Sequence, residues 1–155
     1  MEPKRILIAD REDVANSIKY HLLKDLEGIT CEIVNFSQID RITGNYDLVI
    51  TDIRMPNLDG KDFLKRVKII DKDAIIIVLT GYGSIPSAVE LIKLGAYDYL
   101  EKPINFEELE MSLNRALEKK QIENQLNFFK GMLLTIIISI PLWLILGIIL
   151  ALLWE

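Results

Sequence analysis

Four side chains whose chemistry fits together follow short apolar runs of the chain. Asp10, Asp52 and Thr80 each stand at the end of such a run, and Lys102 comes shortly after another. Two carboxylates, a hydroxyl and an ammonium suit phosphoryl transfer to a carboxylate. The acids would hold a hard cation such as Mg²⁺ through oxygen, and one of them would act as the nucleophile. The lysine and the hydroxyl would then hydrogen-bond the oxygens of the transferred group.

The elements that must position these side chains alternate between two periodicities. Five apolar runs are typical of strands buried on both faces of a parallel sheet: Ile6–Ala9, Ile29–Val34, Asp47–Thr51, Ala74–Thr80 and Tyr97–Leu100. Between them, apolar residues recur every three or four positions, as on one face of a helix. These helical stretches are Val14 to Leu26, Phe63 to Ile70, Ala88 to Ile92 and Asn105 to Leu117, with at best a short helix at 37–44.

Five strands alternating with five helices predict an α/β fold with helices on both faces of a parallel sheet. Ligands of such sheets bind outside the carboxyl ends of the strands. Each of the four polar residues, taken alone, is an ordinary strand end. Four of them at matching ends favour a common site.

Composition excludes several other classes of protein. Residues 1–130 hold all 18 Lys and Arg and 22 of the 23 acids, a net charge of −4, so no basic surplus indicates nucleic-acid binding. The single Cys31 cannot form an internal disulfide and is expected to be a small residue in a strand. The single His21 cannot hold a transition metal by itself and is expected to be a surface or packed residue of a helix. No signal peptide is expected at the start of the chain. Neither a dinucleotide fingerprint nor a P-loop motif is present.

Four stretches of the chain resemble the receiver domain of bacterial two-component response regulators, of which the chemotaxis regulator is a simple example. They are ILIAD at 6–10, DLVITDIRMPNLDG at 47–60, VLTGYGS at 78–84 and GAYDYLEKP at 95–103. The resemblance covers residues 4–118. It implies a flavodoxin-like (βα)5 doubly wound sheet with strand order 2-1-3-4-5.

The same resemblance implies roles for single residues. Asp52 is the expected phosphoacceptor, with Thr80 and Lys102 as the pair that senses the phosphate and Tyr99 as the aromatic switch. Magnesium would be held by Asp10, Asp52 and the backbone carbonyl of Arg54. The resemblance also implies a cis peptide between Lys102 and Pro103, and a turn formed by Met55-Pro56 and Asp59-Gly60.

One position departs from the family pattern. The family usually carries two adjacent acids after its first strand, and here Arg11 takes the place of the second, which is normally the more direct metal ligand. The exchange removes one negative charge from the site and adds one positive charge, so we expect weakened magnesium binding. Either Glu12 or Asp13 turns toward the metal, or the arginine supplies part of the metal's charge.

The C-terminal tail has a different composition. Residues 131–154 contain no charge and include fifteen Leu and Ile, where a membrane span needs about 20 apolar residues. Those fifteen contribute at most roughly −4 to −9 kcal/mol on the insertion scale. The alternative, a helix buried in a partner or oligomer, would have to be surrounded on all faces. The tail therefore predicts a transmembrane helix at 131–154, joined to a receiver domain at 1–118 by a charged helical stalk at 119–130.

Small residues recur on one face of this predicted span. They provide close packing in a homodimer or are scattered along a lipid-facing helix, and the sequence does not separate the two: Thr135, Ser139, Gly147 and Ala151.

The sequence as a whole predicts a receiver domain tethered to the cytoplasmic face of the cell (inner) membrane by a single span. Lys119, Lys120 and Lys130 precede the span and no cation follows it, which favours that orientation. The domain would accept a phosphoryl group from a histidine kinase or phosphotransfer protein and signal through a protein–protein contact, without enzymatic activity beyond its own phosphorylation and dephosphorylation. The alternative, which Arg11 favours, is a degenerate receiver that acts as a phosphorylation-independent membrane docking module.

Overall fold

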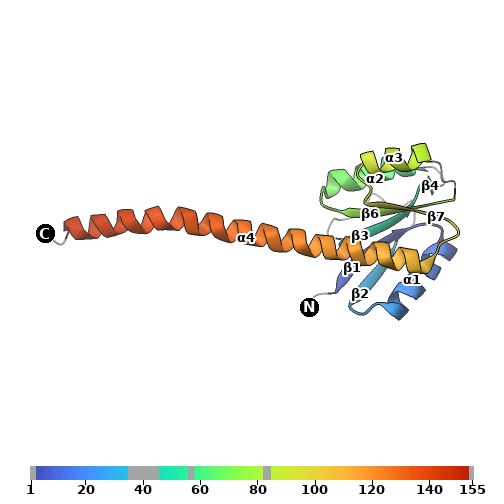
Figure 1. Cartoon of the computed structure of the whole chain (residues 1–155), viewed down its shortest axis with the longest axis horizontal. Helices are drawn as coiled ribbons and strands as arrows, with labels where there is room; N and C mark the ends of the chain where they lie inside the picture. The colour runs from blue at the N-terminus through green and yellow to red at the C-terminus, as the bar shows by residue number, and fades with distance from the viewer. Residues whose placement is uncertain (1–2, 35–45, 56–57, 82–84, 154–155) are drawn as a thin grey trace. The chain divides into compact units, whose positions relative to one another are not determined.

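The structure is a computed structural model that describes residues 3–34, 46–55, 58–81 and 85–153. Five parallel strands form its sheet in the order β2-β1-β3-β6-β7 (Figure 1). Their bounds are Lys4–Ala9 for β1, Ile29–Ile33 for β2, Leu48–Asp52 for β3, Ile75–Thr80 for β6 and Asp98–Glu101 for β7. Counted along the chain, this is the predicted order 2-1-3-4-5.

Two short strands were not predicted. β4 (Arg54–Met55) and β5 (Leu58–Asp59) pair antiparallel in a two-stranded sheet of their own. The sequence indicated only a turn here, because two-residue strands are too short to show an alternating pattern. The hairpin lies directly after the candidate phosphoacceptor and leads into the next helix.

Helices cover both faces of the sheet (Figure 1). Their bounds are Glu12–Asp25 for α1, Gly60–Ile70 for α2, Ile85–Lys93 for α3 and Phe106–Leu153 for α4. Asn105 precedes the last of these, and its Oδ1 accepts a hydrogen bond from the N–H of Glu107 at 3.1 Å, as expected of a capping residue. The short helix predicted at 37–44 lies outside the described residues.

Alternate residues along the strands belong to two separate hydrophobic cores. Leu7, Val49 and Ile76 belong to the core beneath α2 and α3, where Phe63 is fully buried. The other core contains Ile6, Ile8 and Ile50 of the strands together with buried residues of α1 and of the first part of α4: Ile18, Leu22, Leu109 and Leu113. Because side chains alternate along a strand, runs that are apolar without interruption fit a sheet buried on both sides.

The chain divides into two compact units, Met1–Glu118 and Lys119–Glu155. The described part of the second unit, residues 119–153, is helical throughout, and α4 continues through Pro141. From Met132 onward its described large apolar side chains are 43–78 % exposed. Within its own unit this segment therefore has no apolar core.

Gly60 occupies a place that no larger residue fits. Its N–H donates to the carbonyl of Ile53 at 2.9 Å, and a Cβ at this position would lie 2.4 Å from the Cα of Ile53. We expect Gly60→Ala to lower the free energy of unfolding by about 1–3 kcal/mol, because the backbone after the acceptor strand must shift. Gly81→Ala is the control, since a Cβ there meets no atom of the described residues within 4 Å. Equal denaturant midpoints for the two variants would contradict the argument.

Candidate functional site

The predicted site residues lie at the carboxyl ends of neighbouring strands. Asp10 directly follows β1, Asp52 is the last residue of β3, Thr80 the last of β6, and Lys102 directly follows β7. The strand registers pair Asp52 with Leu79 and Thr80 with Glu101. All four residues therefore stand at one edge of the sheet, as the topological argument predicts.

The ammonium of Lys102 joins the two carboxylates. Its Nζ lies 3.0 and 2.8 Å from Oδ1 and Oδ2 of Asp10, and 2.7 Å from Oδ2 of Asp52. The side chain of Asp10 is fully buried, whereas those of Asp52 and Lys102 are 11 % and 18 % exposed. The three groups carry a net charge of −1, and of the two acids Asp52 is the one open to solvent.

Backbone groups hold the same side chains in place. The N–H of Arg54 donates to Oδ1 of Asp52 at 3.0 Å, and the N–H of Arg11 donates to Oδ1 of Asp10 at 2.7 Å. The N–H of Lys102 donates to the carbonyl of Thr80 at 2.7 Å, and the Lys102–Pro103 peptide is cis, as the resemblance implies. Both oxygens of Asp52 thus face hydrogen-bond donors, one on Lys102 and one on the backbone.

Burial raises the pKa of the Asp10 carboxyl above its usual value. The hydrogen bond and charge of Lys102, and the N–H of Arg11, lower this pKa again, while the charge of Asp52 adds to the rise. With the pKa raised, ionised Asp10 is less favourable in the folded chain than in the unfolded chain. Its contribution to stability is therefore present at acid pH and lost as the pH rises through the folded-state pKa.

Because the pKa of Asp10 is raised, we expect Asp10→Asn to change the stability of the fold in a pH-dependent way. The amide keeps an acceptor for Lys102 and Arg11 and removes a buried charge, so we expect the free energy of unfolding at pH 7 to rise by about 1 kcal/mol. The difference between the variant and the unsubstituted chain should shrink as the pH is lowered toward 4. Denaturant unfolding between pH 4 and 7 measures both effects, and a variant that is less stable at pH 7 would show that Lys102 outweighs burial.

Neither Glu12 nor Asp13 is turned toward the expected metal site in this structure. Glu12 is exposed in the first turn of α1, and the carboxylate of Asp13 lies 3.5 Å from Nη2 of Arg11. The Arg11 side chain is itself 65 % exposed. In this structure Asp13 pairs with the arginine that replaces the usual second acid.

Tyr99 lies on β7 and packs against the core beneath α2 and α3. Its hydroxyl is buried and, within the described part of the chain, has no hydrogen-bond partner. Burial, together with the charge of Glu101, raises the pKa of this hydroxyl. A buried donor without a partner costs about 1–3 kcal/mol.

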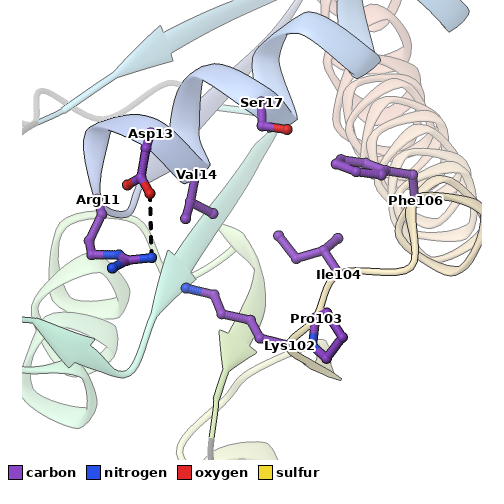
Figure 2. A pocket seen from close by; sticks show the side chains of 8 residues that line it. All are labelled: Arg11, Asp13, Val14, Ser17, Lys102, Pro103, Ile104 and Phe106. Carbon is purple, nitrogen blue, oxygen red and sulfur yellow. Dashed lines mark ion pairs between the residues drawn. The ribbon is translucent and has the colours of Figure 1, made fainter.

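The sequence did not reveal a cavity of about 400 Å³ that Lys102 helps to line (Figure 2). Arg11, Asp13, Val14 and Ser17 line it on the α1 side, and residues 102–104 with Phe106 line it on the other. The ring of Phe106 also stacks on His21 of α1, with 3.7 Å between ring centroids. These residues come from two distant segments with no shared motif, so no pattern in the sequence could have predicted their meeting.

Comparison with known families decides the identity of this fold. The model of the response regulator receiver domain matches residues 6–114. The chain belongs to the response regulator receiver family. This match includes all the site residues described above.

Curated relatives and solved structures agree with the receiver assignment. The transcriptional regulatory protein FixJ of Bradyrhizobium diazoefficiens is 34 % identical over 113 residues, which are 71 % of this chain and 55 % of FixJ. The C4-dicarboxylate transport regulatory protein DctD of Rhizobium meliloti is 34 % identical over 125 residues, which are 77 % of this chain and 26 % of DctD. The chain thus spans about half or less of these two relatives.

Two solved receivers show the same fold. The beryllofluoride-activated NtrC4 receiver domain dimer has a TM-score of 0.68 at 31 % identity, covering 75 % of this chain and 98 % of that one. The receiver of a putative Luxo repressor protein from Vibrio parahaemolyticus has a TM-score of 0.69 at 30 % identity, covering 81 % and 98 %.

Proposed function

We propose that Asp52 accepts a phosphoryl group from a phosphohistidine on a kinase or phosphotransfer protein, and that the receiver then signals through a protein contact. The observation that carries this proposal is the placement of Asp52. It is the partly open carboxylate of the pair, with one oxygen 2.7 Å from Lys102 and the other 3.0 Å from a backbone N–H. Donors on both sides orient the carboxylate for attack.

In the proposed step a carboxylate oxygen of Asp52 forms a bond to phosphorus. The P–N bond of the donor breaks, and its electron pair stays on the imidazole nitrogen, which takes up a proton from water. Lys102 remains beside the new phosphoryl group and hydrogen-bonds the charge on its oxygens. Thr80, at the end of the adjacent strand, supplies a hydroxyl at the same edge of the sheet.

The residues present fit a magnesium ion. Asp10, Asp52 and the carbonyl of Arg54 are hard oxygen ligands, and Mg²⁺ in proteins commonly uses one or two carboxylates with water and phosphate oxygens. In the described ranges no three Asp, Glu, His or Cys side chains form a metal-binding group. The two carboxylates and the Arg54 carbonyl would therefore need water as further ligands. When bound, the ion supplies positive charge that screens the phosphoryl oxygens from the carboxylates. Arg11 contributes no oxygen ligand, and we expect the affinity to be reduced accordingly.

Phosphorylation would be read out through Thr80 and Tyr99. The Tyr99 hydroxyl, which has no partner among the described residues, supports a ring with a second position, since movement to solvent or to a partner relieves the cost of burying a donor. Thr80 pairs in register with Glu101, two residues beyond Tyr99, so a movement of the threonine is transmitted along the β6–β7 pair. The surface formed by α3, β7 and the start of α4 would change as a result.

We also propose that α4 carries the membrane anchor. It contains an 18-residue stretch that is long and apolar enough to cross a membrane, and none of this stretch is buried inside the structure. The lysines before the span favour a receiver on the cytoplasmic side of the inner membrane. We infer no catalytic activity toward a separate substrate.

The experiment that tests this function is phosphorylation of the purified full chain with acetyl phosphate and Mg²⁺, followed by intact-mass analysis. We expect one phosphoryl adduct that disappears on prolonged incubation after the donor is removed. Absence of an adduct with both acetyl phosphate and a phosphorylated phosphotransfer protein would favour the second candidate, a phosphorylation-independent docking module. The observation that favours this rival is the cation at position 11.

A further inference from the structure

The cavity lined by Arg11 and Lys102 reaches the carboxylates of the site through Lys102, and its Arg11 side chain has unused hydrogen-bond donors. The guanidinium of Arg11 makes one ion pair, at 3.5 Å to Asp13, and no hydrogen bond to the described residues. Charge-assisted contacts of arginine with carboxylates are typically about 2.7–2.9 Å, so the pair is a loose one. Figure 2 shows Arg11, at the start of α1, and Lys102, after β7, with their charged ends turned toward one another.

The hydrogen-bond donors of the Lys102 ammonium are in use, whereas the Arg11 guanidinium donates none to the described residues. Its ammonium makes three contacts of 2.7–3.0 Å, two with Asp10 and one with Asp52, so its three N–H donors are occupied. A ligand that enters the cavity therefore meets Arg11 as the cation able to donate at once. The planar fork of a guanidinium suits two phosphate oxygens together.

We propose that Arg11 is a phosphate-binding residue, which holds the phosphate of the incoming donor in this cavity before transfer to Asp52. The inference rests on the proposed function and adds a role to it. Val14 and Ile104 provide apolar walls beside the arginine, and such walls strengthen a charge-assisted contact. Asp13 is the group that the phosphate displaces, which its loose pairing permits.

The charge of the site favours the same assignment. Asp10, Asp52 and Lys102 sum to −1, which repels a phosphate that approaches Asp52. Arg11 and Asp13 add one charge of each sign to the cavity, so the arginine counters this repulsion once the phosphate has displaced Asp13. Arg11 thus takes part of a task that positive charge from a metal would otherwise perform, without being a metal ligand.

The test uses the purified full chain in detergent micelles and inorganic phosphate as the probe. Phosphate is titrated in EDTA, with KCl of matched ionic strength as reference, and ¹⁵N–¹H spectra follow the Arg11 Nε–H. We expect a saturable shift with phosphate and none with KCl. Arg11→Gln should weaken phosphate binding at least tenfold, as followed by the backbone amides of α1, and Arg11→Lys should lie between the two because it keeps the charge but lacks the fork.

Lys24→Gln is the matched control, since it removes one positive charge from the other end of α1 and should leave binding unchanged. The proposal is overturned if phosphate gives no saturable shift, or if Arg11→Gln binds it as well as Lys24→Gln does. Asp52→Asn should bind phosphate at least as tightly as the unsubstituted chain, because it removes a repelling charge. The unsubstituted chain separates the two claims: if it binds phosphate but forms no adduct with acetyl phosphate and Mg²⁺, the proposed function is refuted and the Arg11 site stands.

Discussion

Replacing Asp52 by asparagine is expected to abolish the phosphoryl adduct formed with acetyl phosphate and Mg²⁺. The amide nitrogen and oxygen are poor nucleophiles, and the substitution also removes the charge that Lys102 contacts at 2.7 Å. An amide fits the same space and can still accept from the N–H of Arg54, so the fold should remain. Intact-mass analysis of the variant and the unsubstituted chain, treated side by side, measures the effect.

Asp73→Asn is the control for this experiment, because it makes the same change at an exposed carboxylate between α2 and β6. It should be phosphorylated to the same extent as the unsubstituted chain. Far-ultraviolet circular dichroism of both variants shows that folding is preserved. An undiminished adduct on Asp52→Asn would assign the phosphoryl group to another residue and end the role proposed for Asp52.

The second large effect concerns the tail. The full chain should sediment with membranes and resist a carbonate wash, whereas Ile138→Arg combined with Ile145→Arg should release it. Each arginine near the centre of a span costs about 2.5–3.5 kcal/mol on the insertion scale, so two together offset most of the roughly −4 to −9 kcal/mol contributed by the leucines and isoleucines. Both positions are already exposed within the structure, so the change would cost little in a water-soluble helix.

Ile122→Arg combined with Leu126→Arg is the control for the tail, since these exposed positions lie in the stalk before the apolar segment. This variant should stay in the membrane fraction.

Protease added to right-side-out spheroplasts should leave the receiver intact. A full chain found in the soluble fraction would contradict the anchor, and digestion of the receiver from outside would reverse the topology.

Much of the fold could be predicted because buried parallel strands have an unmistakable pattern. Strand β1 contains the run Ile6–Ala9 and begins two residues earlier, because the polar Lys4 and Arg5 join the ladder, and the run Ala74–Thr80 contains β6 with one residue to spare. The β4–β5 hairpin was missed, since only backbone pairing defines such short strands. The meeting of Asp10, Asp52 and Lys102 followed from topology alone, because the carboxyl ends of parallel strands share one edge.

Details of the site that depend on side-chain packing could not be predicted. Contacts between α1 and the segment after β7, such as the stacking of His21 on Phe106, join residues far apart in sequence without any periodic signal. The hydrogen bond from Ser112 of α4 to Asp98 of β7 is another such contact. The exposed position of Arg11 belongs to the same class, because residue type alone does not say whether a side chain faces the carboxylates or the solvent.

Mapping the phosphoryl group on the full chain shows whether Asp52 is the residue that receives it. Borohydride reduces an aspartyl phosphate to homoserine, and tandem mass spectrometry then locates the altered residue. After treatment with acetyl phosphate and Mg²⁺, we expect homoserine at position 52 and at no other aspartate. Homoserine at Asp10 or at a surface aspartate, with Asp52 unchanged, would contradict it.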